Sequence, residues 1–341
     1  MTGRAGKAAE GVLENVVRQY LPQYAGTPRQ GAKGWNNTTR FIDHDRERCV
    51  LRVYETHQEP EKIEFEHAVL LALTEAELSF RTPVPLRTAK GETLVRLEDG
   101  SGRFACLFAY IEGVRPADED LRPLRAFGET AGELSASLAL IDPGRQPAYR
   151  PYYELDEAYP LCKLERVSGL AADPPSELKK AAPALIRMAE AYAESLRELE
   201  HLRSLPHQLI HGDLNASNLL VRAGEPKIVE ALLDFEFCTY DVRAMDAAVI
   251  LSGLPEGEEP IRLFAEGFRK SVMLSEKEID TIPLLMRLRK VDVFLHFLTR
   301  YWEGIDGWTV LEEQANSLSR DLERMRRNEP ELKLLLTEVL A

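Results

Sequence analysis

Cysteine is scarce in this chain of 341 residues, which contains four cysteines. They are scattered at positions 49, 106, 162 and 238. No pair has the close spacing of a metal-binding motif, and their arrangement does not indicate a disulfide framework. We therefore expect a protein of a reducing compartment, the cytoplasm.

Long apolar runs are also missing. The longest apolar stretches fall far short of the roughly 20 residues that a membrane-spanning helix requires. The first 17 residues lack the continuous apolar segment of a signal peptide and are typical of an amphipathic helix. We expect no membrane partner.

Basic residues are outnumbered: 43 Lys and Arg face 56 Asp and Glu, which gives a net charge of −13. This balance argues against a nucleic-acid partner, because neutralising phosphates requires a basic face. The basic cluster at residues 320–327 alternates with acids at helical spacing and indicates a solvated helix surface. The charge is compatible with a cationic or zwitterionic small substrate but does not establish one.

The length of the chain exceeds the usual size of a single core, so two domains are expected. The expected domains are residues 1–110 and 111–341. Residues 31–110 are strand-rich, with β-type runs at 35–42 and 48–54, one helix at 61–73, and a hairpin formed by 93–97 and 103–110, whereas residues 111–341 are mostly helical. The expected fold class is α+β, with a small N-terminal antiparallel sheet lobe and a larger helical C-terminal lobe. The helices of the second lobe are expected at 121–140, 178–203, 245–251, 259–271, 276–302 and 310–327. The segment 144–175 is rich in Pro and Tyr and is expected to be an irregular loop.

The most informative segment is His-Gly-Asp-Leu-Asn-Ala-Ser-Asn at residues 211–218, followed by an aspartate at 234. Short apolar runs flank it, and a Gly-Pro-type turn at 223–226 separates the two runs that follow. These two runs predict a hairpin that brings Asn218 and Asp234 to the same end, with Asp213 on the incoming loop.

These three residues suit phosphoryl transfer. Mg²⁺ prefers oxygen ligands and retains several waters, so Asn218 and Asp234 are sufficient as its protein ligands. Asp213 is then left to orient the attacking hydroxyl and accept its proton. The alternative is a plain turn, since Asn and Asp favour loops, but the flanking strands favour the functional interpretation. His207 and His211 have the spacing of a helical zinc pair, yet they lie on a strand and a loop, so zinc is rejected.

With these motifs the chain resembles the aminoglycoside phosphotransferase superfamily, which includes homoserine kinase type II, choline kinase and fructosamine kinase relatives. The resemblance covers nearly the whole chain and is carried by His-Gly-Asp-Leu-Asn-Ala-Ser-Asn and by Leu-Leu-Asp-Phe-Glu at 232–236. It implies a bilobal protein-kinase-like fold, with Asp213 as catalytic base and Asn218 and Asp234 as Mg²⁺ ligands. It also implies that Asp246 braces the catalytic loop. Asp241 either has the same bracing role or faces the substrate.

The resemblance implies a nucleotide-binding set in the N-terminal lobe. Residues 34–40 correspond to the loop that covers the nucleotide, where Asn37, Thr38 and Thr39 suit a phosphate cradle. Arg52 occupies the position of a phosphate-binding Lys, and its guanidinium can bridge phosphate oxygens. Its expected ion-pair partner is Glu66, with Glu64 as the competing candidate.

Two further positions follow from the same alignment of motifs. Ala109 and Tyr110 fall where adenine would meet the backbone of the segment that links the lobes.

Other residues are open to two interpretations. His296, Tyr301 and Trp302 either line an acceptor pocket or, as is more common for such spacing, belong to the core. Arg243 either binds a substrate carboxylate or is structural, and the structural interpretation is favoured.

The sequence therefore predicts an ATP- or GTP-dependent kinase that phosphorylates the hydroxyl of a small metabolite and requires Mg²⁺. Homoserine-like, amino-alcohol and sugar-type acceptors rank ahead of aminoglycosides. The alternative is a non-catalytic nucleotide-binding relative, which would be expected to have lost Asp213, Asn218 or Asp234. A protein kinase is disfavoured, because no Ala-Pro-Glu motif follows and there is no room for an activation loop.

Overall fold

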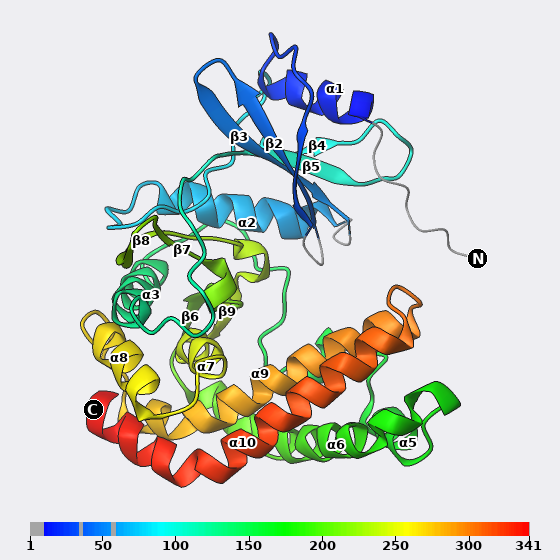
Figure 1. The fold of residues 1–341 in the computed structure, drawn as a ribbon, viewed down its shortest axis with the longest axis vertical. Helices are drawn as coiled ribbons and strands as arrows, with labels where there is room; N and C mark the ends of the chain where they lie inside the picture. Colours follow the sequence, from blue (N-terminus) through cyan, green and yellow to red (C-terminus); the bar gives the residue numbers. More distant parts are fainter. Residues whose placement is uncertain (1–9, 34–36, 56–58, 341) are drawn as a thin grey trace.

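The computed structural model describes residues 10–33, 37–55 and 59–340. A five-stranded antiparallel sheet forms the upper part in Figure 1, and a mostly helical part lies below it. The strands pair in the order β1-β2-β3-β5-β4. Their bounds are β1 (Arg29–Lys33), β2 (Asn37–His44), β3 (Glu47–Tyr54), β4 (Val95–Arg96) and β5 (Phe104–Ala109).

The sheet separates two helices, α1 (Glu10–Tyr20) and α2 (Pro60–Leu73). Because side chains alternate along a strand, Leu51 and Val53 of β3 face the core beneath α1, whereas Arg52 between them points to the side of α2. The predicted helix at 61–73 and the predicted hairpin that contains β4 and β5 are both confirmed.

The helical part is built around two long antiparallel neighbours, α9 and α10, which Figure 1 shows lying side by side. Its helices are α3 (Leu124–Leu138), α4 (Leu155–Ala158), α5 (Leu164–Ala172), α6 (Ala182–Leu196), α7 (Met245–Leu251), α8 (Glu258–Phe268), α9 (Glu276–Trp302) and α10 (Trp308–Leu340). The apolar faces of these helices form one continuous core with the underside of the sheet.

Glycines allow α3 and α8 to pack backbone against backbone. A Cβ added at Gly128 would lie 2.1 Å from the carbonyl oxygen of Phe264, and one at Gly267 would lie 2.2 Å from that of Arg125. No other residue type fits at this distance. The close contact fixes α3 against α8.

Two small sheets hold the polar residues identified above. β6 (His207–Ile210) pairs with β9 (Thr239–Val242), and β7 (Leu219–Arg222) pairs with β8 (Glu225–Leu232). The β7–β8 pair is the predicted hairpin, with Leu219 opposite Leu232. The backbone N–H of Leu233 donates to the carbonyl of Asn218 at 2.8 Å, which holds the two ends of the hairpin together.

Three helical predictions need correction. The segment 144–175 is not irregular throughout, because it contains α4 and α5, and buried Leu155 and Val167 anchor these helices to the core. The expected helix at 178–203 is interrupted: α6 ends at Leu196, and a 3₁₀ turn, η2 (Leu199–Ser204), follows. α10 continues through Pro330 to Leu340, because a row of buried leucines packs its last turns against the core.

No helix in the described ranges is long and apolar enough to span a bilayer.

Candidate active site

The loop at residues 211–218 leaves β6 through a glycine that no other residue can replace. Gly212 has φ +82°, and a Cβ there would lie 2.2 Å from the carbonyl oxygen of Phe237. The left-handed conformation and the close approach together require glycine. This turn leads directly into Asp213, whose side chain lines a cavity described below.

Asp246 at the start of α7 braces this loop through the backbone, as the resemblance implies. Its Oδ2 accepts the N–H of His211 at 2.8 Å, and its Oδ1 accepts that of Gly212 at 3.0 Å. Burial raises the pKa of Asp246, while the hydrogen bonds from the backbone N–H groups of His211 and Gly212 act in the opposite direction.

His211 is a structural residue of the same loop. Its Nδ1 lies 3.3 Å from the backbone N–H of Asp213 and its Nε2 lies 3.0 Å from the carbonyl oxygen of Leu233. The first contact requires an acceptor and the second a donor, so the neutral ring carries its proton on Nε2. His211 therefore ties the loop to the end of the β7–β8 hairpin.

Two asparagines hold the backbone and side chain of Asp213. The Nδ2 group of Asn218 donates to the carbonyl oxygen of Asp213 at 2.9 Å, and that of Asn215 donates to its Oδ1 at 3.1 Å. With its nitrogen so used, Asn218 keeps its side-chain oxygen as the remaining polar atom.

Asp234 adopts the left-handed conformation, with φ 67°, just before the 3₁₀ turn η4 (Phe235–Phe237). Its Oδ1 is buried and accepts no hydrogen bond from the described residues, although Nη2 of Arg52 lies 3.3 Å away as an ion-pair partner. A buried carboxylate oxygen without a hydrogen bond suits a cation ligand.

No cluster of three or more His, Cys, Asp or Glu side chains is arranged as a metal site within the described ranges. Mg²⁺ does not need one, because it takes one or two protein oxygens and keeps its waters. The hydrogen-bond-free oxygen of Asp234 and the amide oxygen of Asn218 therefore fit this ion.

The expected ion pair of Arg52 with Glu66 is present, with Nη1 and Oε1 3.0 Å apart. Tyr54 donates a second hydrogen bond to Glu66 at 2.9 Å. Burial raises the pKa of Glu66, and Arg52 opposes that shift. The competing candidate, Glu64, instead pairs with Arg145 on the surface.

The nucleotide-covering loop needs a correction. Residues 34–36 lie outside the described residues, and Asn37, Thr38 and Thr39 are not in a loop but begin strand β2. The start of β2 contacts the helical part of the molecule, because Nδ2 of Asn37 donates to Oε2 of Glu236 at 2.7 Å. This hydrogen bond joins β2 to η4.

Ala109 and Tyr110 lie at the end of β5, where the chain leaves the sheet. Their backbone N–H groups are already donated, to the carbonyl oxygens of Val84 at 3.0 Å and Arg48 at 3.1 Å. Any backbone contact of these two residues with a base would therefore use their carbonyl oxygens.

Sequence reasoning missed Arg289 of α9, which donates to Oδ1 of Asp213. The guanidinium also donates through Nη1 to the hydroxyl of Tyr152 at 3.0 Å and to Oδ2 of Asp292 at 3.3 Å. Burial disfavours its charge, but the neighbouring acidic groups outweigh burial and hold the pKa of Arg289 above its ordinary value. Because α9 contains many charged residues, the sequence does not indicate which of its arginines faces inward.

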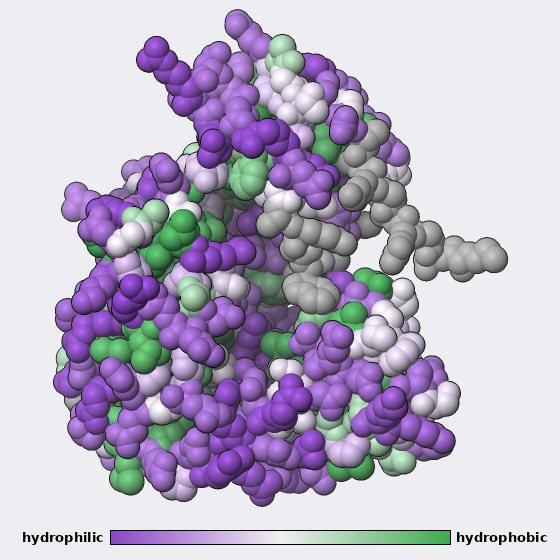
Figure 2. Space-filling view, viewed as in Figure 1, coloured by the Kyte–Doolittle hydropathy of each residue, from purple (hydrophilic) through white to green (hydrophobic). Residues whose placement is uncertain are grey.

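Beside Asp213 and Arg289 lies a cavity of about 730 Å³. Its walls are residues 148–152 and 157–159, the loop at 212–217 and the inner face of α9. Its basic side chains are Lys62, Arg150, Arg289 and Arg300, and its acidic ones are Glu157, Asp213, Asp292 and Glu303. Positive and negative groups are thus equal in number. Figure 2 shows the surface hollowed between the sheet part and the helical part.

The side chains on α9 that were open to two interpretations lie in different environments. His296 lines this cavity, whereas Tyr301 packs against the core and Trp302 lies against Arg166, whose Cζ is 3.8 Å from the ring centroid. Arg243 is structural, as favoured, because it makes a bidentate pair with Glu278 at 2.6 and 2.8 Å.

Asp241 does not brace the catalytic loop. It accepts the N–H groups of Tyr152 and Val242, both at 2.6 Å, and so positions the cavity wall. Burial raises its pKa to about 7, although these two hydrogen bonds favour the ionised form.

The comparison with known families agrees with this geometry. The phosphotransferase enzyme family matches residues 27–278. The chain belongs to this family. A homoserine kinase of Zymomonas mobilis is 26% identical over 315 residues, covering 86% of this chain and 88% of its own length. Another from Methylobacterium nodulans is 28% identical over 268 residues, covering 74% of each chain.

Solved structures show the same fold. A microcompartment-associated aminopropanol kinase superposes with a TM-score of 0.69 at 19% identity, covering 94% of this chain and 99% of its own. An amicoumacin kinase in complex with AMP-PNP, Ca²⁺ and Ami gives a TM-score of 0.66 at 18% identity, covering 96% of this chain and 93% of its own. The expected protein-kinase-like α+β fold is confirmed, and the protein is a small-molecule kinase.

Proposed function

We propose that this phosphotransferase moves the γ-phosphoryl group of ATP, or GTP, to a hydroxyl of a small metabolite in the cavity beside Asp213. One observation carries the proposal. Asp213 opens onto the cavity, while Asn218 and the hydrogen-bond-free oxygen of Asp234 lie at the other end of the same loop and hairpin. An acceptor and a nucleotide can therefore approach each other across the loop.

Each of these residues has a separate role in the proposed phosphoryl transfer. Asp213 orients the acceptor hydroxyl and accepts its proton as the bond from the acceptor oxygen to the γ-phosphorus forms. The bond from the γ-phosphorus to the β–γ bridging oxygen breaks, and the nucleoside diphosphate leaves. Asn218 and Asp234 would hold Mg²⁺, which when bound neutralises charge on the phosphates. Arg52, kept in place by Glu66, would bind phosphate oxygens from the sheet side. Residues 1–110 then form the nucleotide-binding lobe and residues 111–341 the acceptor lobe.

The regulatory alternative is disfavoured by the completeness of this set. A non-catalytic relative has no need for a catalytic aspartate, and Asp213, Asn218 and Asp234 are all present and positioned by hydrogen bonds or ion pairs. We rank homoserine-like and amino-alcohol acceptors ahead of aminoglycosides, and the balanced charge of the cavity and the similarity to homoserine kinases support this ranking.

The proposal is tested by Mg²⁺-dependent ATP consumption of the wild type and of Asp213→Ala with amino alcohols, hydroxy amino acids, sugars, choline and aminoglycosides. We expect turnover with one acceptor class and a fall in kcat of about 10²- to 10⁴-fold in the variant, because the proton acceptor is lost. ATP binding should persist in the variant. Absence of ATP binding by the wild type would contradict the proposal.

A further inference from the structure

We propose that the acceptor carries a carboxylate and that Arg289 binds it, which makes the acceptor class a hydroxy amino acid. The inference rests on the proposed phosphoryl transfer at Asp213. It assigns to Arg289 a part in acceptor selection in addition to its contact with Asp213.

Arg289 has donors to spare. Its three acceptors are Asp213, Tyr152 and Asp292. A guanidinium carries more N–H groups than these three hydrogen bonds use. The side chain is 19% exposed and lines the acceptor cavity, so the remaining N–H groups are within reach of a bound molecule.

The guanidinium is also held before any ligand arrives. It projects from the long helix α9 and is fixed by Asp292, whose Oδ1 accepts the hydroxyl of Tyr159 at 2.6 Å. A fixed planar fork binds a carboxylate bidentately at little cost in side-chain entropy. Because the same guanidinium contacts Asp213, a carboxylate on Arg289 would set the distance between that carboxylate and the reacting hydroxyl.

The other basic side chains of the cavity are less suited to this task. Arg300 is 8% exposed in its side chain and is bound by both oxygens of Asp306, at 2.5 and 3.2 Å. Arg150 is 62% exposed and pairs with Glu154. Lys62 pairs with Glu59 and lies 5.0 Å from the Tyr149 ring centroid. Among the described residues that line the cavity, Arg289 is the basic group that adjoins Asp213.

The acidic side chains indicate the second charge of the acceptor. Glu157 and Glu303 are exposed on the cavity wall, and neither has an ion-pair partner among the described residues. They suit an ammonium group. A polycationic acceptor would meet Arg289 next to the catalytic aspartate, where its charge is repelled. A zwitterion satisfies both kinds of group.

The test compares three acceptors that differ by one group: L-homoserine, 3-aminopropan-1-ol, which lacks the carboxylate, and 4-hydroxybutanoate, which lacks the ammonium. In the wild type we expect kcat/KM for homoserine to exceed that for 3-aminopropan-1-ol by about 10- to 100-fold, as expected for charge-assisted hydrogen bonds. In Arg289→Gln this ratio should fall to about 1, chiefly because KM for homoserine rises. Arg289→Lys should recover part of the preference.

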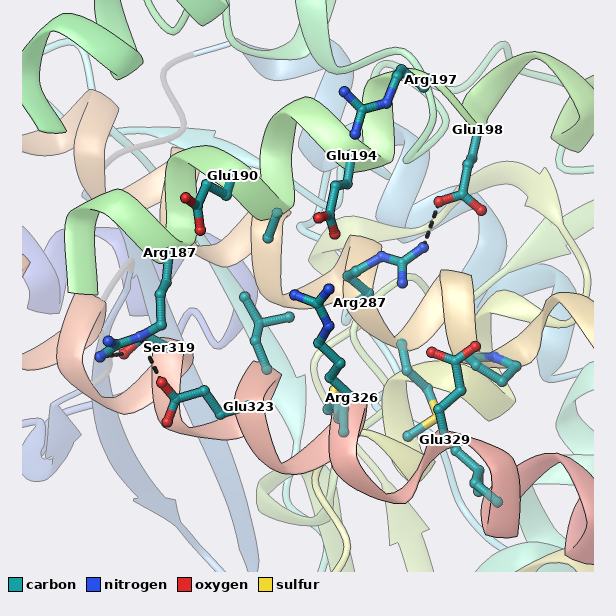
Figure 3. A pocket seen from close by; sticks show the side chains of 16 residues that line it. Arg187, Glu190, Glu194, Arg197, Glu198, Arg287, Ser319, Glu323, Arg326 and Glu329 are labelled. Atoms are coloured by element: carbon teal, nitrogen blue, oxygen red, sulfur yellow. Dashed lines mark hydrogen bonds and ion pairs between the residues drawn. The ribbon is translucent and has the colours of Figure 1, made fainter. Parts of the chain in front are cut away.

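Arg287→Gln is the matched control, because it makes the same change two residues earlier on α9. Arg287 donates to Glu198 at 2.8 Å and lines a separate cavity of about 370 Å³ between α6, α9 and α10. Figure 3 shows this arginine facing that cavity with Glu198, Glu194 and Arg326 around it. The acceptor preference of Arg287→Gln should equal that of the wild type.

The outcomes separate this inference from the proposed function. If homoserine is phosphorylated but Arg289→Gln keeps the wild-type ratio, or if the wild type does not prefer the carboxylated acceptor, only the inference is overturned. If no acceptor is phosphorylated and ATP does not bind, the proposed function fails as well. If Arg289→Gln loses all turnover because Asp213 is displaced, the same ratio is taken from acceptor affinities measured calorimetrically with a non-hydrolysable ATP analogue.

Discussion

Two arginines make similar contacts on the two sides of the loop and hairpin that carry Asp213 and Asp234. Arg52 joins Asp234 to Glu66 of α2, and Arg289 joins Asp213 to Asp292 of α9. Each is largely buried, with side-chain exposures of 14% and 19%, and each has a tyrosine nearby. Each therefore fixes one aspartate of the loop and hairpin by linking it to a carboxylate on a helix.

The two arginines differ in what they connect. Arg52 is on the sheet and reaches across to Asp234 of the helical part, whereas Arg289 and its acceptors all belong to the helical part. A change in the position of the sheet relative to the helices would therefore alter the contacts of Arg52 and leave those of Arg289 intact. Nucleotide binding should be sensitive to closure of the two parts, and acceptor binding should not.

The largest effect should come from the nucleotide side. Asp234→Asn removes the charge of the proposed metal ligand, and asparagine tolerates the left-handed backbone at this position, so the fold should persist. We expect KM for Mg²⁺-ATP to rise by about 10²-fold or more. Asp213→Ala, on the acceptor side, should instead leave the affinity for ATP unchanged.

Equilibrium titration with a fluorescent ATP analogue distinguishes the two variants. Equal loss of nucleotide affinity in both would show that the two sides of the loop are not functionally separate.

The smallest effect should be a pH dependence of stability on the acceptor side. The folded pKa of Asp241 is raised to about 7, so folding favours its protonated form. Its contribution to stability is fully present below the unfolded pKa near 4 and is lost as the pH rises through 7. Relative to Asp241→Asn, the free energy of unfolding of the wild type should fall by about 2 kcal/mol between pH 5 and pH 7.

Urea denaturation at several pH values measures this difference. Asp156→Asn is the control, since Asp156 is a half-exposed residue of the nearby α4 and should follow the wild type. Parallel curves for the wild type and Asp241→Asn would contradict the assigned protonation.

The nucleotide side was predictable from the sequence because its residues are close together or alternate regularly along the chain. The hairpin after Asn218 and the helix that carries Glu66 both follow from local patterns, and both are confirmed. Arg289 could not be predicted, because its contacts join α9 to residues 76 and 137 positions away. The contact of Asn37 with Glu236 could not be predicted either, because these residues are 199 positions apart in the chain.

The most direct test of this account is to measure KM for both substrates in Arg52→Gln and Arg289→Gln under identical conditions. We expect Arg52→Gln to raise KM for ATP by about 10- to 100-fold while KM for the acceptor changes by less than about twofold. Arg289→Gln should show the reverse pattern. If each variant raised both constants to a similar extent, the assignment of one arginine to the nucleotide and the other to the acceptor would be contradicted.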